Sequence, residues 1–322
     1  ERGGTIVLGG GETGTVLVSG TLDASGGNPG EVGGTIKVLG DKVGLIDSAS
    51  LDVSGSSGGG EILVGGNFQG GGSEQTATFT FVGSDASLNA DALSEGDGGR
   101  VIVWADNTTR FSGDIKARGG SAGGDGGFAE VSGKLNLVFR GTADLTAASG
   151  SIGSILFDPT SIEVRNAGGD NITQNLFSES TNANLDFDAD LLEGLGASVT
   201  LQANNDIIID EVINLTTSGA SLTLQAGRNI DINASITTNN GAIVITANDT
   251  GAVNSRRNAG DFAGGSVTGD IDINGDLTAG TGNISLTIAA GSGSANDGTV
   301  GSITGSSELN NSGSVTLNVV AD

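Results

Sequence analysis

The sequence predicts an all-β fold: a right-handed parallel β-helix (β-solenoid) of about a dozen coils, with a short helical or loop insertion in mid-chain. Three observations predict it. Gly accounts for 59 of the 322 residues and Pro for only 2. Apolar residues recur in short alternating runs separated by Gly, Asn, Asp and Ser, which is a pattern of strands and turns. These runs repeat along the whole chain at intervals of about twenty to thirty residues.

The first repeated unit is Gly-Gly-x-apolar-x-apolar. In its complete copies the fourth and sixth slots are apolar, whereas the fifth varies freely. Because a strand alternates its faces, slots 4 and 6 should face the interior and slot 5 should face water. The copies are 3–8, 33–38, 59–64, 98–103 and 126–131, with a degenerate one at 154–157. The slot-5 residues are Lys37, Leu63, Ile102 and Glu130.

Two further strands follow in each coil. One is a Leu-Asp-Ala-like unit, whose middle residue should point outward. Its two flanking residues should face the core; where one of them is larger in a given copy the other is smaller, so that the total core volume is kept. The other is an apolar segment that lies between the Gly-Gly unit and the Leu-Asp-Ala-like unit, such as 16–18, 79–81 and 137–139. Three strands in each 26–30-residue interval describe one coil of a solenoid, which must stack on its neighbours at ~4.8 Å per coil. The outward residues are Asp23, Asp52, Asn89, Lys116 and Asp144.

Glycine is frequent because each corner of a coil needs a positive φ or a tight bend. One interval in the first repeat is 39 residues long, which implies an insertion of about ten residues. We assign it to residues 67–74 and expect it to leave the solenoid as a loop.

The second half has a shorter repeat. The motif of 198–203 recurs at 221–226 and 242–247, so the coil has 21–23 residues. The gap from Ile245 to Leu286 is 41 residues, which we read as two coils that contain a surface loop at 248–265.

The organisation that follows has three parts. Residues 1–158 form Gly-rich coils of 26–30 residues, 159–197 form a joint with a short helix at 188–196, and 198–322 form coils of 21–23 residues. Asp188 or Asp190 should cap the helix, and Gly should end it. We expect one continuous rod about 50 to 60 Å long.

The composition excludes several function classes. The chain has no Cys and no His, so thiol chemistry, Ser-His-Asp hydrolysis and zinc catalysis are absent from this segment. The formal charge of -25 would repel a nucleic-acid backbone. No apolar run is long enough for a transmembrane helix. The chain begins in mid-pattern without a leader, so we expect it to be a piece of a longer protein.

The stretch 98–113, followed by 117–120 and 126–133, resembles filamentous haemagglutinin-like exoproteins of two-partner secretion systems in Gram-negative bacteria and cyanobacteria. Residues 156–162 and 199–207 strengthen the resemblance, which covers nearly the whole chain. The family implies a right-handed β-helix, a secreted or outer-surface location, and adhesion or haemagglutination. It also implies export through an outer-membrane β-barrel transporter as partner.

One motif departs from the family pattern. The family's secretion domain carries Asn-Pro-Asn-type motifs, but here only Asn28-Pro29-Gly30 occurs, and we interpret it as a turn. We therefore expect the segment that the transporter recognises to lie elsewhere in the parent protein.

Several polar residues have side chains that could carry chemistry. The row that includes Asp23, Asp52 and Asp144 has the residue types of a polysaccharide-cleaving pair or a cation site, but Asn89 and Lys116 interrupt it, which favours a solvated face. The runs 123–127 and 10–14 read as turns, because the first lacks a calcium repeat and the second lacks a phosphate-loop Lys.

Trp104 aligns with Leu39, which favours a buried corner over an exposed platform for sugar. The arginines at 100, 110, 118, 256 and 257 have the charge to bind anionic glycans, but on so acidic a chain we read them as ordinary surface charges. We assign no catalytic, cofactor-binding or metal-binding residue.

The sequence leaves three functions open. The first is a secreted, non-catalytic adhesin-like rod that presents or spaces a binding region, with a host glycan or surface receptor as partner. The second is a carbohydrate-active β-helix enzyme, a lyase or glycosidase, although such clefts usually concentrate aromatic residues and these make up only 3% of this chain. The third is the stalk of a contact-dependent toxin.

Overall fold

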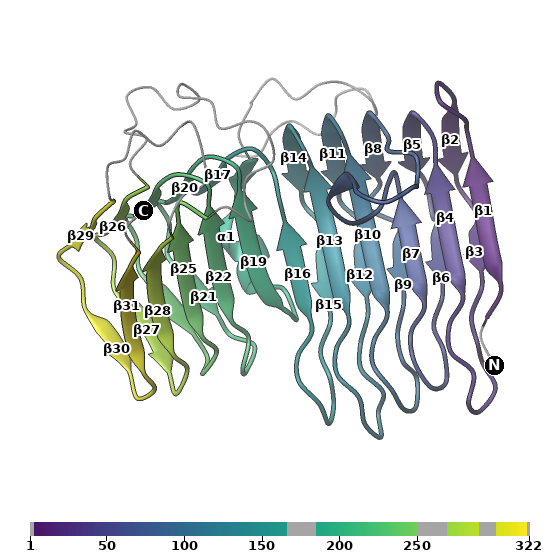
Figure 1. The fold of residues 1–322 in the computed structure, drawn as a ribbon. Coiled ribbons are helices and arrows are strands. Elements are labelled where there is room, and N and C mark those ends of the chain that lie inside the picture. Colours follow the sequence, from purple (N-terminus) through teal and green to yellow (C-terminus); the bar gives the residue numbers. More distant parts are fainter. Residues whose placement is uncertain (1–2, 166–184, 250–268, 290–300, 321–322) are drawn as a thin grey trace. The chain divides into compact units, whose positions relative to one another are not determined.

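The structure is a computed structural model, and it describes residues 3–165, 185–249, 269–289 and 301–320. The described chain is a right-handed parallel β-helix, in which each strand pairs with the equivalent strand of the next coil (Figure 1). It divides into two compact units, which are described in turn. Unit 1 contains residues 1–157 and 195–198, and unit 2 contains 158–165, 185–194 and 199–322, each apart from the residues not described.

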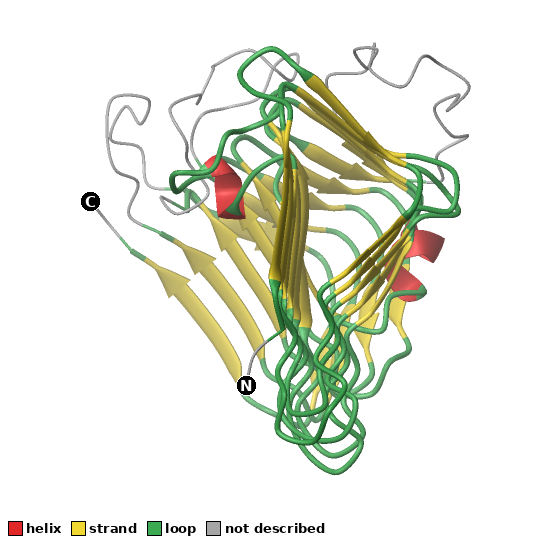
Figure 2. Ribbon diagram, turned by 90° about the vertical axis from the view of Figure 1, so that its right-hand side faces the viewer, coloured by secondary structure: helices red, strands yellow, loops and turns green. Residues whose placement is uncertain are grey.

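Unit 1 has three parallel sheets, one strand of each per coil, arranged around a common interior (Figure 2). The first sheet contains β1 (Thr5–Gly9), β4 (Thr35–Leu39), β7 (Glu61–Val64), β10 (Arg100–Ala105), β13 (Phe128–Gly133) and β16 (Ser154–Phe157). The second contains β2 (Thr15–Val18), β5 (Lys42–Leu45), β8 (Phe79–Val82), β11 (Thr108–Phe111) and β14 (Asn136–Phe139). The third contains β3 (Thr21–Asp23), β6 (Ser50–Asp52), β9 (Ser87–Asn89), β12 (Asp114–Lys116) and β15 (Thr142–Asp144).

The core of unit 1 consists of straight inner rows. Ile36, Ile62, Val101 and Ala129 occupy consecutive places in one row and are completely buried. This confirms slots 4 and 6 as the inner positions. Aromatic side chains also pack on one another in the interior. Phe111 stacks on Phe139 with ring centroids 5.5 Å apart, and Phe139 contacts Phe157 edge to face with centroids 4.8 Å apart.

Unit 2 also has three parallel sheets, two of which correspond to recurrent motifs of the sequence: the motif of 198–203 and an Ile-rich motif at 206–210, 229–233 and 270–274. The first contains β19 (Ser198–Ala203), β22 (Leu222–Ala226), β25 (Ile243–Ala247), β28 (Ile284–Ile288) and β31 (Val315–Val319). The second contains β18 (Leu185–Phe187), β17 (Ile162–Val164), β20 (Ile207–Ile209), β23 (Ile230–Ile232), β26 (Ile271–Ile273) and β29 (Ile303–Gly305). The third, not identified from sequence, contains β21 (Ile213–Leu215), β24 (Ile236–Thr238), β27 (Leu277–Gly280) and β30 (Leu309–Asn311).

The 41-residue interval in unit 2 is one coil, not two. Strand β25 pairs directly with β28, with Ile243 opposite Ile284 and Ile245 opposite Leu286. Strands β23 and β26 pair across the same interval, with Asp231 opposite Asp272. The extra residues are an insertion nearly as long as a coil, so the distance of 41 residues between equivalent positions is close to that expected for two coils. The predicted surface loop at 248–265 lies almost entirely outside the described residues.

The short helix is confirmed as α1 (Ala189–Glu193) in unit 2. Asp188 is the N-cap, and its carboxylate accepts a hydrogen bond of 3.1 Å from the amide of Asp190. Gly194 ends the helix, and Leu192 is buried. Among the described residues, no helix is both long and apolar enough to cross a bilayer.

Some corner glycines have the positive φ that the sequence predicts, such as Gly30, Gly58 and Gly96, but those directly before the first sheet of unit 1 have a different cause. None of the glycines at 33, 34, 59, 60, 98, 99, 126 and 127 has a positive φ. Their reason is close approach: a Cβ on Gly99 would overlap the carbonyl oxygen of Gly60 in the preceding coil, and a Cβ on Gly98 would overlap that of Ala117. Coils can stack at this corner only where side chains are missing.

Candidate functional site

The outward Asp row is in register, as the sequence predicts. Asp23 lies opposite Asp52, Asp52 opposite Asn89, and Lys116 opposite both Asn89 and Asp144. Its members also shape the chain, because each of the three Asp residues accepts a hydrogen bond from the backbone amide two residues later, at 2.8–3.1 Å. The hydroxyl and amide of Ser25 lower the pKa of Asp23. The three Asp residues of the row are therefore turn-forming carboxylates.

The arginines lie apart from one another. Arg100 is on the first sheet and Arg110 on the second, whereas Arg118 follows the third and donates two hydrogen bonds, at 2.6 and 3.1 Å, to the Asp91 carboxylate. Arg256 and Arg257 lie outside the described residues. The described arginines therefore do not form a joint anion site.

The other motifs are turns. Residues 10–14 connect β1 to β2, and Asn28 begins a turn in which its amide donates to the Glu31 carboxylate at 2.9 Å. Gly123 and Gly124 have positive φ in the loop that precedes β13. In the described ranges, no group of three or more His, Cys, Asp or Glu side chains has the geometry of a metal site.

The insertion does not leave the solenoid. Residues 65–78, which we call the strap, connect β7 to β8 and lie over the outer face of the first sheet (Figure 1). The strap contains a 3-10 turn, η1 (Phe68–Gly70), whose amide at Phe68 is capped by Asn67. Its position corrects the prediction for slot 5, because Leu63, Ile102 and Glu130 are buried although they face outward.

A small second core therefore exists outside the solenoid. Leu63, Ile102 and Trp104 form it beneath the strap, with Phe128 packed against them. Trp104 is buried, as expected, but on the outer face and not at an inner corner. The strap approaches so closely that a Cβ on Gly66 or Gly70 would lie 2.8 or 2.7 Å from the indole ring. Burial excludes Trp104 as a platform for sugar.

The following polar contacts link the strap to three other coils. Lys37 Nζ and Glu74 Oε1 are 2.9 Å apart, and Asn67 donates to Glu74 Oε2 at 3.0 Å. The lysine and the amide together lower the pKa of Glu74 to about 2. Gln69 donates its backbone amide to the buried Glu130 carboxylate at 3.1 and 3.2 Å, and the side chain of Gln75 donates to the Gly11 carbonyl at 2.8 Å.

Beside the strap lies a groove of about 830 Å³, which we call the corner groove. It passes along the stack immediately before β4, β7, β10, β13 and β16, and its floor is the backbone of the corner glycines. One wall consists of Glu61, Arg100 and Phe128, which are in register on consecutive coils. Asp97 and Asp125, which precede the corner glycines of consecutive coils, also line the groove.

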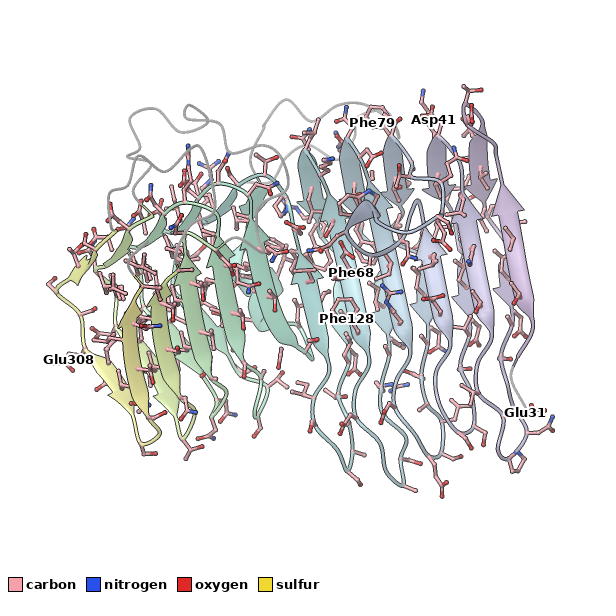
Figure 3. All side chains as sticks on the ribbon, in the orientation of Figure 1. Glu31, Asp41, Phe68, Phe79, Phe128 and Glu308 are labelled. Atoms are coloured by element: carbon pink, nitrogen blue, oxygen red, sulfur yellow. The ribbon has the colours of Figure 1, made fainter. Side chains whose placement is uncertain are left out.

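Phe128, which lines this groove, forms an aromatic pair with Phe68 of the strap. Their ring centroids are 5.8 Å apart with the rings edge to face, and both lie on the side of unit 1 turned to the viewer in Figure 3. The Arg100 guanidinium lies 5.7 Å from the Phe68 ring centre, and it donates to Glu61 at 2.8 Å and to Asn67 at 3.2 Å. Phe68 nevertheless remains 39% exposed.

The strap and its second core were not predicted, although the sequence contains a signal for them. Slot 5 is polar or charged at Lys37 and Glu130 but apolar at Leu63 and Ile102, and Trp104 follows in the next outward slot. Two outward apolar residues next to an insertion of about ten residues indicate that the insertion covers them. The groove itself is a product of stacking and has no sequence motif.

No family model matches this chain, and no curated protein matches it significantly.

Proposed function

We propose that the protein is a secreted, non-catalytic adhesin of the filamentous haemagglutinin-like type, which presents a binding surface on an extended stack of β-coils at the cell surface. The observation that supports this most is the conserved register within each unit. Strand after strand pairs with the same strand of the next coil, and backbone groups at the corners bond to the neighbouring coil. A scaffold of this kind extends by adding coils and offers the same outer rows at each step.

The outer rows also fit an adhesive role better than a catalytic one. Carboxylates of the Asp row, such as Asp23 and Asp52, bind backbone amides of their own turns. Asp91 is occupied by Arg118, and Asp206 by the buried Arg228. These acids serve the scaffold, whereas a glycosidase needs a pair of carboxyl groups directed at one substrate bond.

The test is binding of the purified 322-residue protein to erythrocytes and epithelial cells, with agglutination and bound fluorescence as readouts. We expect saturable binding that an excess of unlabelled protein displaces. Depolymerisation of polysaccharides by the same preparation, without saturable cell binding, would contradict the proposal in favour of an enzyme.

A further inference from the structure

We propose that the corner groove of unit 1 binds a linear, uncharged oligosaccharide, an inference that rests on the proposed adhesive function and identifies its ligand class. The groove spans five successive corners, from Gly33 to Gly153. With ~4.8 Å between coils, it offers a track of roughly 20 Å for an extended chain.

The glycine floor provides space but no binding groups. Glycine is required there by stacking, and the amides of the floor are already used: those of Gly60, Gly99 and Gly127 donate to the carbonyls of Val53, Ala90 and Ala117 at 2.7–2.8 Å. A peptide therefore has no free strand edge to extend at the floor, and an anion has no nest of amides. Binding must come from the walls.

The walls carry carboxylates suited to hydroxyl groups. Asp97 accepts a hydrogen bond of 2.7 Å from the Asp125 amide through Oδ1, and Asp125 accepts one of 2.7 Å from the Ser151 amide, also through Oδ1. These bonds fix the two side chains on successive coils of the groove. The Oδ2 atoms are left for a ligand, and a carboxylate accepts strong hydrogen bonds from hydroxyl groups.

Charge decides between neutral and anionic ligands. The groove is lined by three acids, Glu61, Asp97 and Asp125, and by one base, Arg100, so its walls have a net charge of -2. The single guanidinium is already paired with Glu61. An anionic glycan would meet two unpaired carboxylates, whereas a neutral one would not be repelled.

The aromatic pair supplies the apolar surface that a sugar needs. Phe128 lines the groove, and Phe68, which the strap holds against Phe128 and Arg100, remains 39% exposed. A ring at the groove offers the apolar face of a sugar a surface on which to pack, while the sugar hydroxyl groups bond to the acids that line the same groove.

The experiment is titration calorimetry of the 322-residue protein with linear hexasaccharides of neutral glucans and mannans, and with hexagalacturonate and a heparin hexasaccharide as anionic probes. We expect at least one neutral series to bind and the anionic probes to bind at least tenfold more weakly. Phe68→Ala, and the double variant Asp97→Asn with Asp125→Asn, should each weaken binding at least fivefold. The Asn variants keep an Oδ1 acceptor for the backbone amides.

Matched controls make the same chemical change elsewhere in unit 1. Phe79→Ala removes a ring from β8 in the second sheet, and Asp52→Asn changes the Asp row; both should leave affinity within twofold of the parent. The groove proposal would be overturned by any of three results: equal affinity of the groove variants and the control variants, a preference for anionic probes, or no binding of neutral probes at millimolar concentration. Cell binding measured on the same samples separates the two proposals, because adhesion without glycan binding contradicts only the groove.

Discussion

The corner glycines show how a single missing carbon sets the stacking of the coils. Because a Cβ on Gly99 would overlap the carbonyl oxygen of Gly60, Gly99→Ala should lower the free energy of unfolding of unit 1 by about 2–3 kcal/mol. Gly27→Ala is the matched control: a Cβ there has open space and its φ is not positive, so the change should be within ~0.5 kcal/mol. Urea unfolding followed by circular dichroism measures both. Equal effects would show that corner packing does not require glycine.

Asp231 lies in a crowded acidic region of unit 2. Burial, followed by the charges of Asp206 and Asp272, raises the pKa of its carboxyl group above the ordinary 3.8. An acid whose folded pKa is raised destabilises the fold when ionised, and this cost disappears once both folded and unfolded forms are protonated. Asp231→Asn should therefore stabilise unit 2 at pH 7 by up to ~1 kcal/mol.

The pH dependence is the control for this substitution. Thermal unfolding of parent and variant should differ at pH 7 and converge at about pH 3, below the ordinary pKa of 3.8. A gain that is equal at both pH values would show that the effect is not electrostatic.

At the residue scale the sequence predicted the inner rows correctly and one outer row incorrectly. Alternation is dictated by strand geometry, so Ile36, Val101 and Ala129 could be placed inside without a structure. Exposure of slot 5 is not a property of the strand alone, because it depends on whether another segment covers the sheet. Leu63 and Ile102 are buried by residues that follow Val64 in the chain, and that fold-back is a tertiary contact.

The strap is the element whose stability can be followed most directly, since Trp104 beneath it is the only Trp in the chain. The depressed pKa of Glu74 means that its ion pair with Lys37 contributes fully above pH 4.5 and is lost as the pH falls toward 2. Acrylamide quenching of Trp104 should stay low from pH 7 to 4.5 and then rise. Glu74→Gln should favour strap opening by ~1 kcal/mol and increase quenching already at pH 7.

A neutral substitution elsewhere in unit 1 tests whether this effect is specific. In the variant Glu95→Gln, whose substitution lies in an exposed loop, acrylamide should quench Trp104 to the same extent as in the parent protein. If Glu74→Gln also matched the parent across the whole pH range, the Lys37–Glu74 pair would not hold the strap.

Strand β31 shows what an uncovered coil looks like. Val315, Leu317 and Val319 are 45–61% exposed, although their register partners Ile284, Leu286 and Ile288 on β28 are buried. In the 322-residue chain, amide hydrogen exchange should be at least ~10-fold faster in β31 than in β28. Equal protection of the two strands in a monomer would mean that something covers this row.

The misread interval of 41 residues has a physical reason. Sequence spacing counts residues but not turns, so an insertion about as long as a coil gives the same distance between motifs as an extra coil. The polar outer row indicates which strands pair across the interval. Asp231 and Asp272 occur in the same Ile-Asp-Ile context, which marks their strands as equivalent strands of neighbouring coils. The third sheet of unit 2 was missed because its strands β21 and β24 have only three residues each and share no motif.

For the whole molecule, everything depends on coil-to-coil register. Adjacent coils bring equivalent Cα atoms to ~4.8 Å, within the range for a disulfide, whereas coils two apart are ~9.6 Å away and outside it. The prediction that one continuous rod results concerns both units together and stays a prediction.

The most direct test uses the absence of Cys from the chain, because any introduced pair can form only one intramolecular bond. Mild oxidation and peptide mapping should show rapid disulfide formation in Asp23→Cys/Asp52→Cys and in Asp231→Cys/Asp272→Cys, which are opposite each other in unit 1 and unit 2. Asp23→Cys/Asn89→Cys, two coils apart, should stay reduced. Bonding in this last pair, or its absence in the first two, would contradict the stacked β-helix described here.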